Sequence, residues 1–188
     1  MAIQEYKTIT WKEQGIFIIS GIMASGKSTV AQLLAERFDR GVHIRGDVFR
    51  KMIVSGREEM LPDASAEALA QLSLRYRIAA AAADAYFEAG FTVVIQDIII
   101  GPQLGEFVKL IQNRPLFVVV LAPCVEVVAE REASRHKKGY GEWTIPQLNN
   151  ILQNETPRIG TWLDSSGQTA EETVNEILTK AWVEARIY

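Results

Sequence analysis

Short runs of apolar, mostly β-branched residues alternate along the chain with longer stretches in which apolar residues recur every three or four positions. The short runs predict strands and the longer stretches predict helices. We expect strands at 15–21, 42–46, 91–96, 115–122 and 160–164. This alternation is typical of a three-layer α/β/α fold, in which helices cover both faces of a parallel sheet.

Three helices are indicated by their own patterns. One follows the first strand over Thr29–Phe38, and a long one precedes Gly90, with its apolar positions at Leu69, Leu72, Tyr76, Ala79, Ala83 and Phe87. The last starts at a capping box, Thr169 with Glu172. Its apolar face is expected at Val174, Ile177, Leu178, Ala181 and Trp182. No linker or repeat divides the chain, so residues 1–188 are expected to form a single domain.

Composition and charge argue against nucleic acid and membranes as partners. The formal net charge of −3 argues against a surface that coats nucleic acid. No apolar run approaches the roughly 20 residues that cross a bilayer, and residues 1–14 lack the apolar core of a signal peptide. We therefore expect a cytoplasmic protein without nucleic-acid or membrane partners, either a monomer or a small homo-oligomer.

With one cysteine and two histidines, the chain has few side chains that could bind a metal such as zinc or act as a thiol nucleophile. Cys124 cannot form an internal disulfide, and the two histidines do not make a zinc-binding cluster. Cys124 follows a predicted strand and has no activating neighbour in sequence, so we expect it to pack in the interior rather than act as a nucleophile.

Residues 21–28 read GIMASGKS and fit the phosphate-binding pattern GxxxxGK[ST] at every required position. The segment lies between a predicted strand and a predicted helix, where backbone N–H groups and the helix N-terminus face an anion. Lys27 would add charge at the β- and γ-phosphates, and the Ser28 hydroxyl would bind Mg²⁺. The expected nucleotide contacts are Gly21, Met23, Ala24, Ser25, Gly26, Lys27, Ser28 and Thr29. The alternative is an ordinary turn between strand and helix.

Asp47 follows the second predicted strand. In a parallel sheet ligands bind beyond the carboxyl ends of the strands, so Asp47 is placed to accept the proton of a substrate hydroxyl. Arg50 lies one helical turn further on and would steady the substrate. The alternative is a helix-capping Asp with a surface ion pair to Arg50.

Asp97 ends the third predicted strand, VVIQD, which resembles a Walker B strand. Its expected role is to bind Mg²⁺ directly or through water, and Gln96 beside it would contact substrate. The alternative is an Asp that opens a loop. Arg75, in the long helix, either lines the acceptor pocket or lies on the surface. Arg50, Arg57 and Arg75 are the acceptor region's candidate anion ligands.

A basic stretch follows the fourth predicted strand. Arg131 and Arg135 are four residues apart and are expected to share a helix face, ahead of Lys137 and Lys138. On a closing loop these cations would cover the triphosphate and stabilise the transferring group. The alternative is a solvated helix C-terminus, where basic residues favour the helix dipole.

Together these motifs resemble the small P-loop kinases of the nucleoside monophosphate kinase-like group. The likeness is greatest to chloramphenicol phosphotransferase-like proteins and related AAA-type small-molecule kinases, and it runs from about residue 15 to 180. It implies a five-stranded parallel sheet in the order 2-3-1-4-5, an acceptor-binding helical region at 48–89 and a lid at 131–143. It also implies that Asp47 is the base and that Ser166 and Gln168 lie near adenine.

The sequence thus predicts an ATP- and Mg²⁺-dependent kinase that phosphorylates a hydroxyl of a small molecule. Its catalytic residues would be Lys27, Asp47, Arg131 and Arg135. The acceptor and the choice of ATP over another nucleoside triphosphate stay open. A nucleotide-sensing regulator and a kinase toxin or nucleic-acid end kinase are the alternatives. A GTPase is disfavoured because the chain lacks an Asn-Lys-x-Asp motif.

Overall fold

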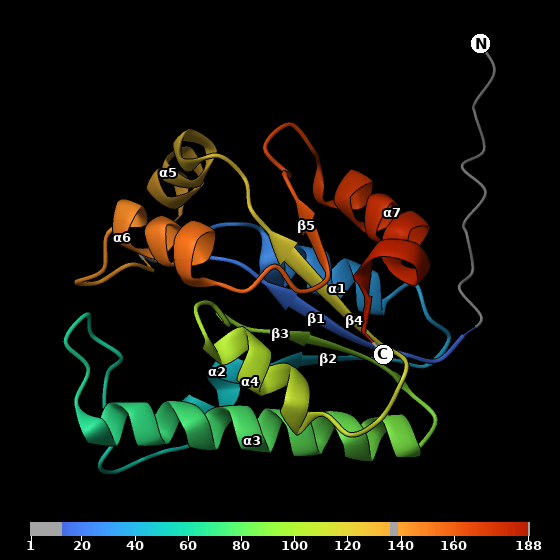
Figure 1. The fold of residues 1–188 in the computed structure, drawn as a ribbon, viewed down its shortest axis with the longest axis horizontal. Helices are drawn as coiled ribbons and strands as arrows, with labels where there is room; N and C mark the ends of the chain where they lie inside the picture. The colour runs from blue at the N-terminus through green and yellow to red at the C-terminus, as the bar shows by residue number, and fades with distance from the viewer. Residues whose placement is uncertain (1–12, 136–138, 188) are drawn as a thin grey trace.

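The computed structural model describes residues 13–135 and 139–187, which form a central sheet between two layers of helices (Figure 1). The strands are β1 (Ile16–Ser20), β2 (Gly41–Arg45), β3 (Thr92–Gln96), β4 (Leu116–Leu121), β5 (Thr161–Leu163) and β6 (Arg186–Ile187). The α-helices are α1 (Lys27–Ala35), α2 (Gly46–Lys51), α3 (Ala66–Glu88), α4 (Gln103–Leu110), α5 (Val125–Ser134), α6 (Ile145–Asn150) and α7 (Ala170–Lys180). Two π-helical turns, η1 (Ile151–Glu155) and η2 (Ala181–Ala185), continue α6 and α7.

The first five strands are parallel and lie in the order β2-β3-β1-β4-β5, which confirms the predicted order. A sixth strand was not expected. Arg186 and Ile187 pair antiparallel with Phe117 and Leu116 at the start of β4. Two residues are too short to carry an alternating pattern, so the sequence gave no signal for β6.

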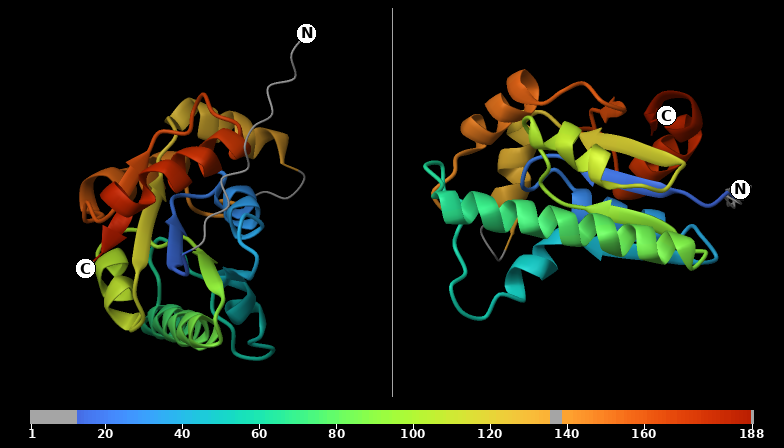
Figure 2. Two further views of the ribbon diagram at one scale, coloured as in Figure 1. Left: turned by 90° about the vertical axis from the view of Figure 1, so that its right-hand side faces the viewer. Right: turned by 60° about the horizontal axis from the view of Figure 1, so that its bottom comes forward.

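Side chains alternate between two cores because successive residues of a strand point to opposite faces. Ile16 and Ile18 of β1 face the core formed with α3 and α4, whereas Phe17 and Ile19 face the core formed with α1 and α7. Figures 1 and 2 show α3 running along one face of the sheet with α4 beside it. All four residues have no exposed surface, as expected for a strand covered on both sides.

Several boundaries differ from those the sequence predicted. Helix α1 ends at Ala35, before the expected Phe38, and Gly46 begins α2 instead of ending the second strand. Helix α7 does start at Thr169, whose side chain caps it in a capping box with Glu172, but it ends at Lys180. Trp182 therefore lies in η2, outside the helix predicted to carry it.

The long helix appears as α3, capped by the Ser65 hydroxyl, which accepts a hydrogen bond from the Ala68 N–H at 3.0 Å. Helices α4 and α6 were not predicted. Within the described ranges, no helix combines the length and apolar character needed to cross a membrane. The carboxyl ends of β1, β2 and β3 lie at one edge of the sheet, where the candidate site is found.

Candidate functional site

The loop at 21–28 joins β1 to α1 in a conformation that its glycines permit. A Cβ added at Gly21, where φ is +140°, would lie 2.4 Å from the Leu121 carbonyl oxygen, so only glycine fits there. Gly26 caps α1 with φ of +97°, and Ala24 takes the left-handed region at +61°. Such a backbone is uncommon for a residue other than glycine and tends to occur where a site holds it in place.

Lys27 is buried inside this loop. Its Nζ donates hydrogen bonds to the Ile22 carbonyl oxygen at 2.5 Å and to Ser25 Oγ at 3.4 Å. Burial lowers the pKa of Lys27 to about 7, although the nearby carboxylate of Asp97 acts in the opposite direction. An anionic ligand in the loop would restore the charge of the ammonium group.

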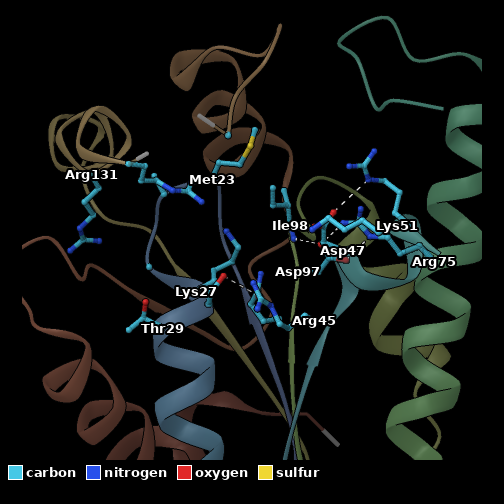
Figure 3. Close-up of a pocket in the computed structure, with 17 residues that line it drawn as sticks. Met23, Lys27, Thr29, Arg45, Asp47, Lys51, Arg75, Asp97, Ile98 and Arg131 are labelled. Carbon is cyan, nitrogen blue, oxygen red and sulfur yellow. Dashed lines mark hydrogen bonds and ion pairs between the residues drawn. The ribbon is translucent and has the colours of Figure 1, made fainter. Parts of the chain in front are cut away.

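A cavity of about 610 Å³ lies over this loop (Figure 3). Its lining from the loop is Met23, Ala24, Gly26, Lys27, Ser28 and Thr29. The other lining residues are Arg45, Asp47, Arg50, Lys51, Arg75, Gln96, Asp97, Ile98, Arg131, Arg135 and Gly139. We call this space the first cavity. Most of the predicted site residues therefore meet in one place, with Gly21 and Ser25 forming the loop behind it.

The Ser28 hydroxyl donates a hydrogen bond to Gln96 Oε1 at 3.2 Å. Both groups line the first cavity, and oxygen ligands of this kind suit Mg²⁺, which also keeps waters and phosphate oxygens. The residues present therefore fit a magnesium ion held by Ser28 beside a nucleotide phosphate.

Asp47 lies in the first turn of α2 and is half exposed. It pairs with Lys51, one turn further on, and accepts a hydrogen bond from Arg50 Nε at 3.5 Å. Burial acts to raise the pKa of Asp47, but the Lys51 hydrogen bond and the charges of Lys51, Arg50 and Arg75 outweigh it and lower that pKa. The alternative interpretation of Asp47 was a helix cap with an ion pair to Arg50. The N-cap of α2 is Arg45, so the capping part is wrong, whereas the ion pair with Arg50 is present.

Asp97 is buried and held by Arg75. Arg75 Nε donates to Asp97 Oδ2 at 2.7 Å, its Nη2 donates to Oδ1, and the Ile98 N–H also donates to Oδ1 at 2.8 Å. Burial raises the pKa of Asp97, and the Arg75 guanidinium opposes that rise. Arg75 itself is only 12% exposed, so its surface position, one of the two alternatives, is excluded.

Arg131 and Arg135 both line the first cavity, but they do not share a helix face. Helix α5 ends at Ser134, and Arg135 has extended backbone angles. Arg131 donates to the Ser25 carbonyl oxygen at 3.4 Å and to the Ser165 carbonyl oxygen at 3.0 Å, which joins the phosphate loop to the segment after β5. Lys137 and Lys138 lie outside the described residues.

Described residues of the predicted lid, 131–143, form hydrogen bonds within the segment and to other parts of the chain. The Gly139 N–H donates to Glu132 Oε1 at 2.5 Å, and the Tyr140 hydroxyl donates to the Met23 carbonyl oxygen at 2.9 Å. Trp143 Nε1 donates to the Met60 carbonyl oxygen at 2.7 Å. These contacts bring the segment against both the phosphate loop and the predicted acceptor region.

Ser166 and Gln168 are not brought to either cavity. Ser166 Oγ donates to Asp164 and accepts from the Cys124 N–H at 2.7 Å. Gln168, just before α7, donates a hydrogen bond to Glu176 and accepts one from Thr173, both in that helix. Cys124 itself is exposed, so its predicted packing in the interior is wrong; it stands at the N-cap of α5, which turns its side chain out of the core.

A second cavity, of about 580 Å³, shares Met23, Asp47, Arg50, Arg75, Ile98 and Gly139 with the first. Its remaining lining comes from the predicted acceptor region at 48–89, from 100–103, from the lid, and from α6 and η1. The contribution of α6 and η1 was missed because neither element was predicted. Asp47 stands where the two cavities meet.

Three lining residues of the first cavity were not singled out from the sequence: Arg45, Lys51 and Ile98. Lys51 was detectable, since it follows Asp47 by four residues on a short helix. Arg45 is the last residue of β2 and Ile98 follows β3 by two positions, so both reach the cavity at the carboxyl ends of these neighbouring strands.

Comparison with solved structures shows a similar fold in two kinases and a resistance protein, all at low sequence identity. A sugar kinase from Janibacter sp. HTCC2649 matches with a TM-score of 0.67 and 20% identity, over 89% of this chain and 94% of that chain. The Deinococcus radiodurans tunicamycin resistance protein matches at 0.63 and 19%, over 89% and 95%. The Mycobacterium tuberculosis APS kinase, in complex with AMPPNP and APS, matches at 0.61 and 16%, over 88% and 96%.

Comparison with curated proteins gave no match. A family model described as an AAA domain matches residues 16–156, which is well over half of the chain and includes the phosphate loop, Asp47, Asp97 and Arg131. With this match and the P-loop NTPase fold shown by the strand order, the chain belongs to that AAA domain family.

Proposed function

We propose that the protein is a phosphotransferase that moves the γ-phosphate of ATP to a hydroxyl of a small molecule. The observation that carries this proposal is the position of Asp47, which lines both the phosphate-loop cavity and the second cavity. A carboxylate at the junction of two cavities suits transfer between two ligands, whereas a nucleotide sensor requires only the first cavity.

The donor would be bound by the phosphate loop. Loop residues and the first turn of α1 line the first cavity, so their backbone N–H groups would bind the phosphates, and Lys27 supplies a buried amine there. Arg131, which bonds the Ser25 carbonyl oxygen of the loop, lines the same cavity as Arg135, and the charge of both would stabilise the transferring phosphoryl group. Phosphoryl transfer depends chiefly on such positioning and charge, since little covalent work falls to the protein.

The acceptor hydroxyl would be oriented by Asp47. The pKa of this carboxyl lies below its usual range, so the group is ionised at neutral pH and can accept the hydroxyl proton. Arg50 and Lys51 hold the carboxylate in place. Gln96, which bonds Ser28, would lie between acceptor and donor.

Mg²⁺ would be held by Ser28 and would neutralise phosphate charge when bound. Both oxygens of Asp97 already accept hydrogen bonds from Arg75, which favours a contact between Asp97 and the metal through water rather than directly. The main task of Asp97 in this arrangement is to hold Arg75 against the junction of the cavities.

The test is transfer of radiolabelled γ-phosphate from ATP to a panel of alcohols, compared between the wild type and Asp47→Asn. Loss of a general base should lower transfer by about 10²- to 10⁴-fold while ATP affinity stays unchanged. Asp63→Asn removes an exposed carboxylate that lines neither cavity and serves as the control. Undiminished transfer by Asp47→Asn would reject the assigned role, and failure of every alcohol to raise turnover above slow hydrolysis would favour the regulator.

A further inference from the structure

The second cavity has mostly apolar walls. Leu72 and Tyr76 of α3 line it, together with Ile100, Leu148 and Ile151. Tyr76 and Leu148 are buried in the core beneath the surface, so these walls are part of the packed structure. An occupant of this cavity gains by burying an apolar ring or chain.

Among the described residues, the two arginines that line this cavity are each paired with a carboxylate. Arg50 Nη1 donates to both carboxylate oxygens of Glu59 at 2.8 Å, and its Nε contacts Asp47. Arg75 makes two hydrogen bonds to Asp97. Arg57, the third arginine considered from the sequence, is exposed and lines neither cavity. An anionic acceptor would thus meet guanidinium groups whose positive charge an internal carboxylate already balances.

Two further carboxylates line the cavity without such compensation. Glu142 and Glu155 are exposed at its wall, and within the described residues neither forms an ion pair with a lysine or arginine. Glu155 Oε1 accepts only a long hydrogen bond, 3.5 Å, from Asn150. With Asp47 and Glu59 also present, carboxylates outnumber cations among the described residues that line this cavity.

The first cavity has the opposite character. Five cations line it besides Arg50 and Arg75: Lys27, Arg45, Lys51, Arg131 and Arg135. Of these five, Lys51 pairs with Asp47 and Arg135 with Glu132, and the described residues show no ion pair for the other three. The two cavities therefore sort ligands by charge: the triphosphate is attracted to the first, and a second anion would be repelled from the acidic wall of the other.

Building on the phosphotransferase function proposed above, we infer that the acceptor is an uncharged or positively charged alcohol that carries an apolar ring or chain. Its apolar body lies against Leu72, Tyr76, Ile100 and Ile151, any amine faces Glu142 and Glu155, and its hydroxyl reaches Asp47. Phosphorylated and carboxylated acceptors are selected against.

Binding tests this inference without relying on turnover. The probes are 3-phenylpropane-1,2-diol and its para-aminomethyl and para-carboxylate derivatives, with glycerol as a probe that lacks the apolar body. Affinities are measured by calorimetry with Mg²⁺ and a saturating non-hydrolysable ATP analogue, which keeps the carboxylate out of the first cavity. The neutral and amine probes should bind about tenfold tighter than the carboxylate, because like charges disfavour it. A carboxylate probe that binds equally or better, or no binding by the neutral and amine probes, overturns the inference.

Substitutions at the cavity wall test which residues cause the preference for the amine probe over the carboxylate probe. Glu142→Gln combined with Glu155→Gln should reduce the preference for the amine over the carboxylate probe about fivefold, whereas Glu126→Gln, exposed on α5 and lining neither cavity, should leave it unchanged. Leu72→Asn should weaken all three aryl probes while the ATP analogue still binds. An unchanged preference in the double variant contradicts the assigned wall.

Transfer assays on the same probes separate the two proposals. If the carboxylate derivative or a phosphorylated sugar is the best substrate, the inference is wrong and the phosphotransferase stands. If the probes bind in the expected order but none is phosphorylated, the charge selectivity of the cavity stands and the proposed function is wrong.

Discussion

Arg75, in the middle of α3, binds both carboxylate oxygens of Asp97 at the end of β3. The pair is largely withdrawn from solvent, with 12% and 5% of the two side chains exposed. It joins the long helix to the sheet beside the phosphate loop, and Arg75 forms part of the wall of both cavities. This buried ion pair therefore ties α3, in the predicted acceptor region, to the end of the sheet that carries the phosphate loop.

Arg75→Met should destabilise the fold by about 3–5 kcal/mol, because it leaves the buried Asp97 carboxylate without its partner. Arg77→Met, on an exposed position of the same helix, should stay within about 0.5 kcal/mol of the wild type. Urea unfolding measures both. The double variant Arg75→Met/Asp97→Asn should recover a large part of the loss, and no recovery would show that the charge of Asp97 is not its cause.

Gly46→Ala should be destabilising by about 1–3 kcal/mol through overpacking. A Cβ at Gly46 would lie 2.0 Å from Asp97 Oδ2, and Asp97 cannot move aside without releasing Arg75. Gly167→Ala, which meets no atom within 4 Å, is the matched control. Thermal melting compares the two; equal melting temperatures would mean that the Asp97 carboxylate adjusts freely.

The buried Lys27 predicts a pH dependence of stability. Its pKa is about 7 in the folded protein against 10.5 for the ordinary amine, so between these values the unfolded chain binds one more proton than the folded one. The burial cost is complete below pH 7 and is relieved as pH rises toward 10.5. The free energy of unfolding of the wild type, relative to Lys27→Met, should rise by about 1 kcal/mol per pH unit from pH 7.5 to 9.5. A flat difference would contradict the lowered pKa.

Tyr140→Phe removes the hydrogen bond between the lid and the Met23 carbonyl oxygen of the phosphate loop. We expect a loss of about 1 kcal/mol in stability and a severalfold rise in the Kd for the ATP analogue, since Met23 lines the first cavity. Tyr86→Phe, on a partly exposed residue of α3 outside both cavities, is the comparison. Calorimetric titration of both variants measures the Kd. An equal Kd for Tyr140→Phe and Tyr86→Phe would mean that this hydrogen bond does not contribute to nucleotide binding.

Much of the fold was predictable because its signals are local. Apolar runs located β1 to β5, the GxxxxGKS pattern located the turn into α1, and the capping box at Thr169 located the start of α7. The strand order 2-3-1-4-5 came from the resemblance to small P-loop kinases, and the structure confirms it. The misses, β6 and the unpredicted α4 and α6, are short elements whose formation depends on what they pack against.

Part of the candidate site was likewise predictable from local sequence, and part was not. Residues that directly follow a strand, such as Asp47 and Asp97, or that belong to the phosphate loop could be assigned to one edge of the sheet from sequence alone. The partners of Asp97 and Arg50 could not, since Arg75 is 22 residues from Asp97 and Glu59 lies in the segment between α2 and α3. Nothing in the local pattern distinguishes a paired arginine from one free to bind an anion.

The sequence by itself determined that the chain builds a parallel sheet with a phosphate-binding loop, because backbone propensity and motif spacing act over a few residues. Only the tertiary structure decided which charges neutralise one another, since that depends on side chains that meet across elements far apart in the chain. Folding leaves a cavity rich in cations at the phosphate loop and an acidic, apolar one beside it, with Asp47 where they meet.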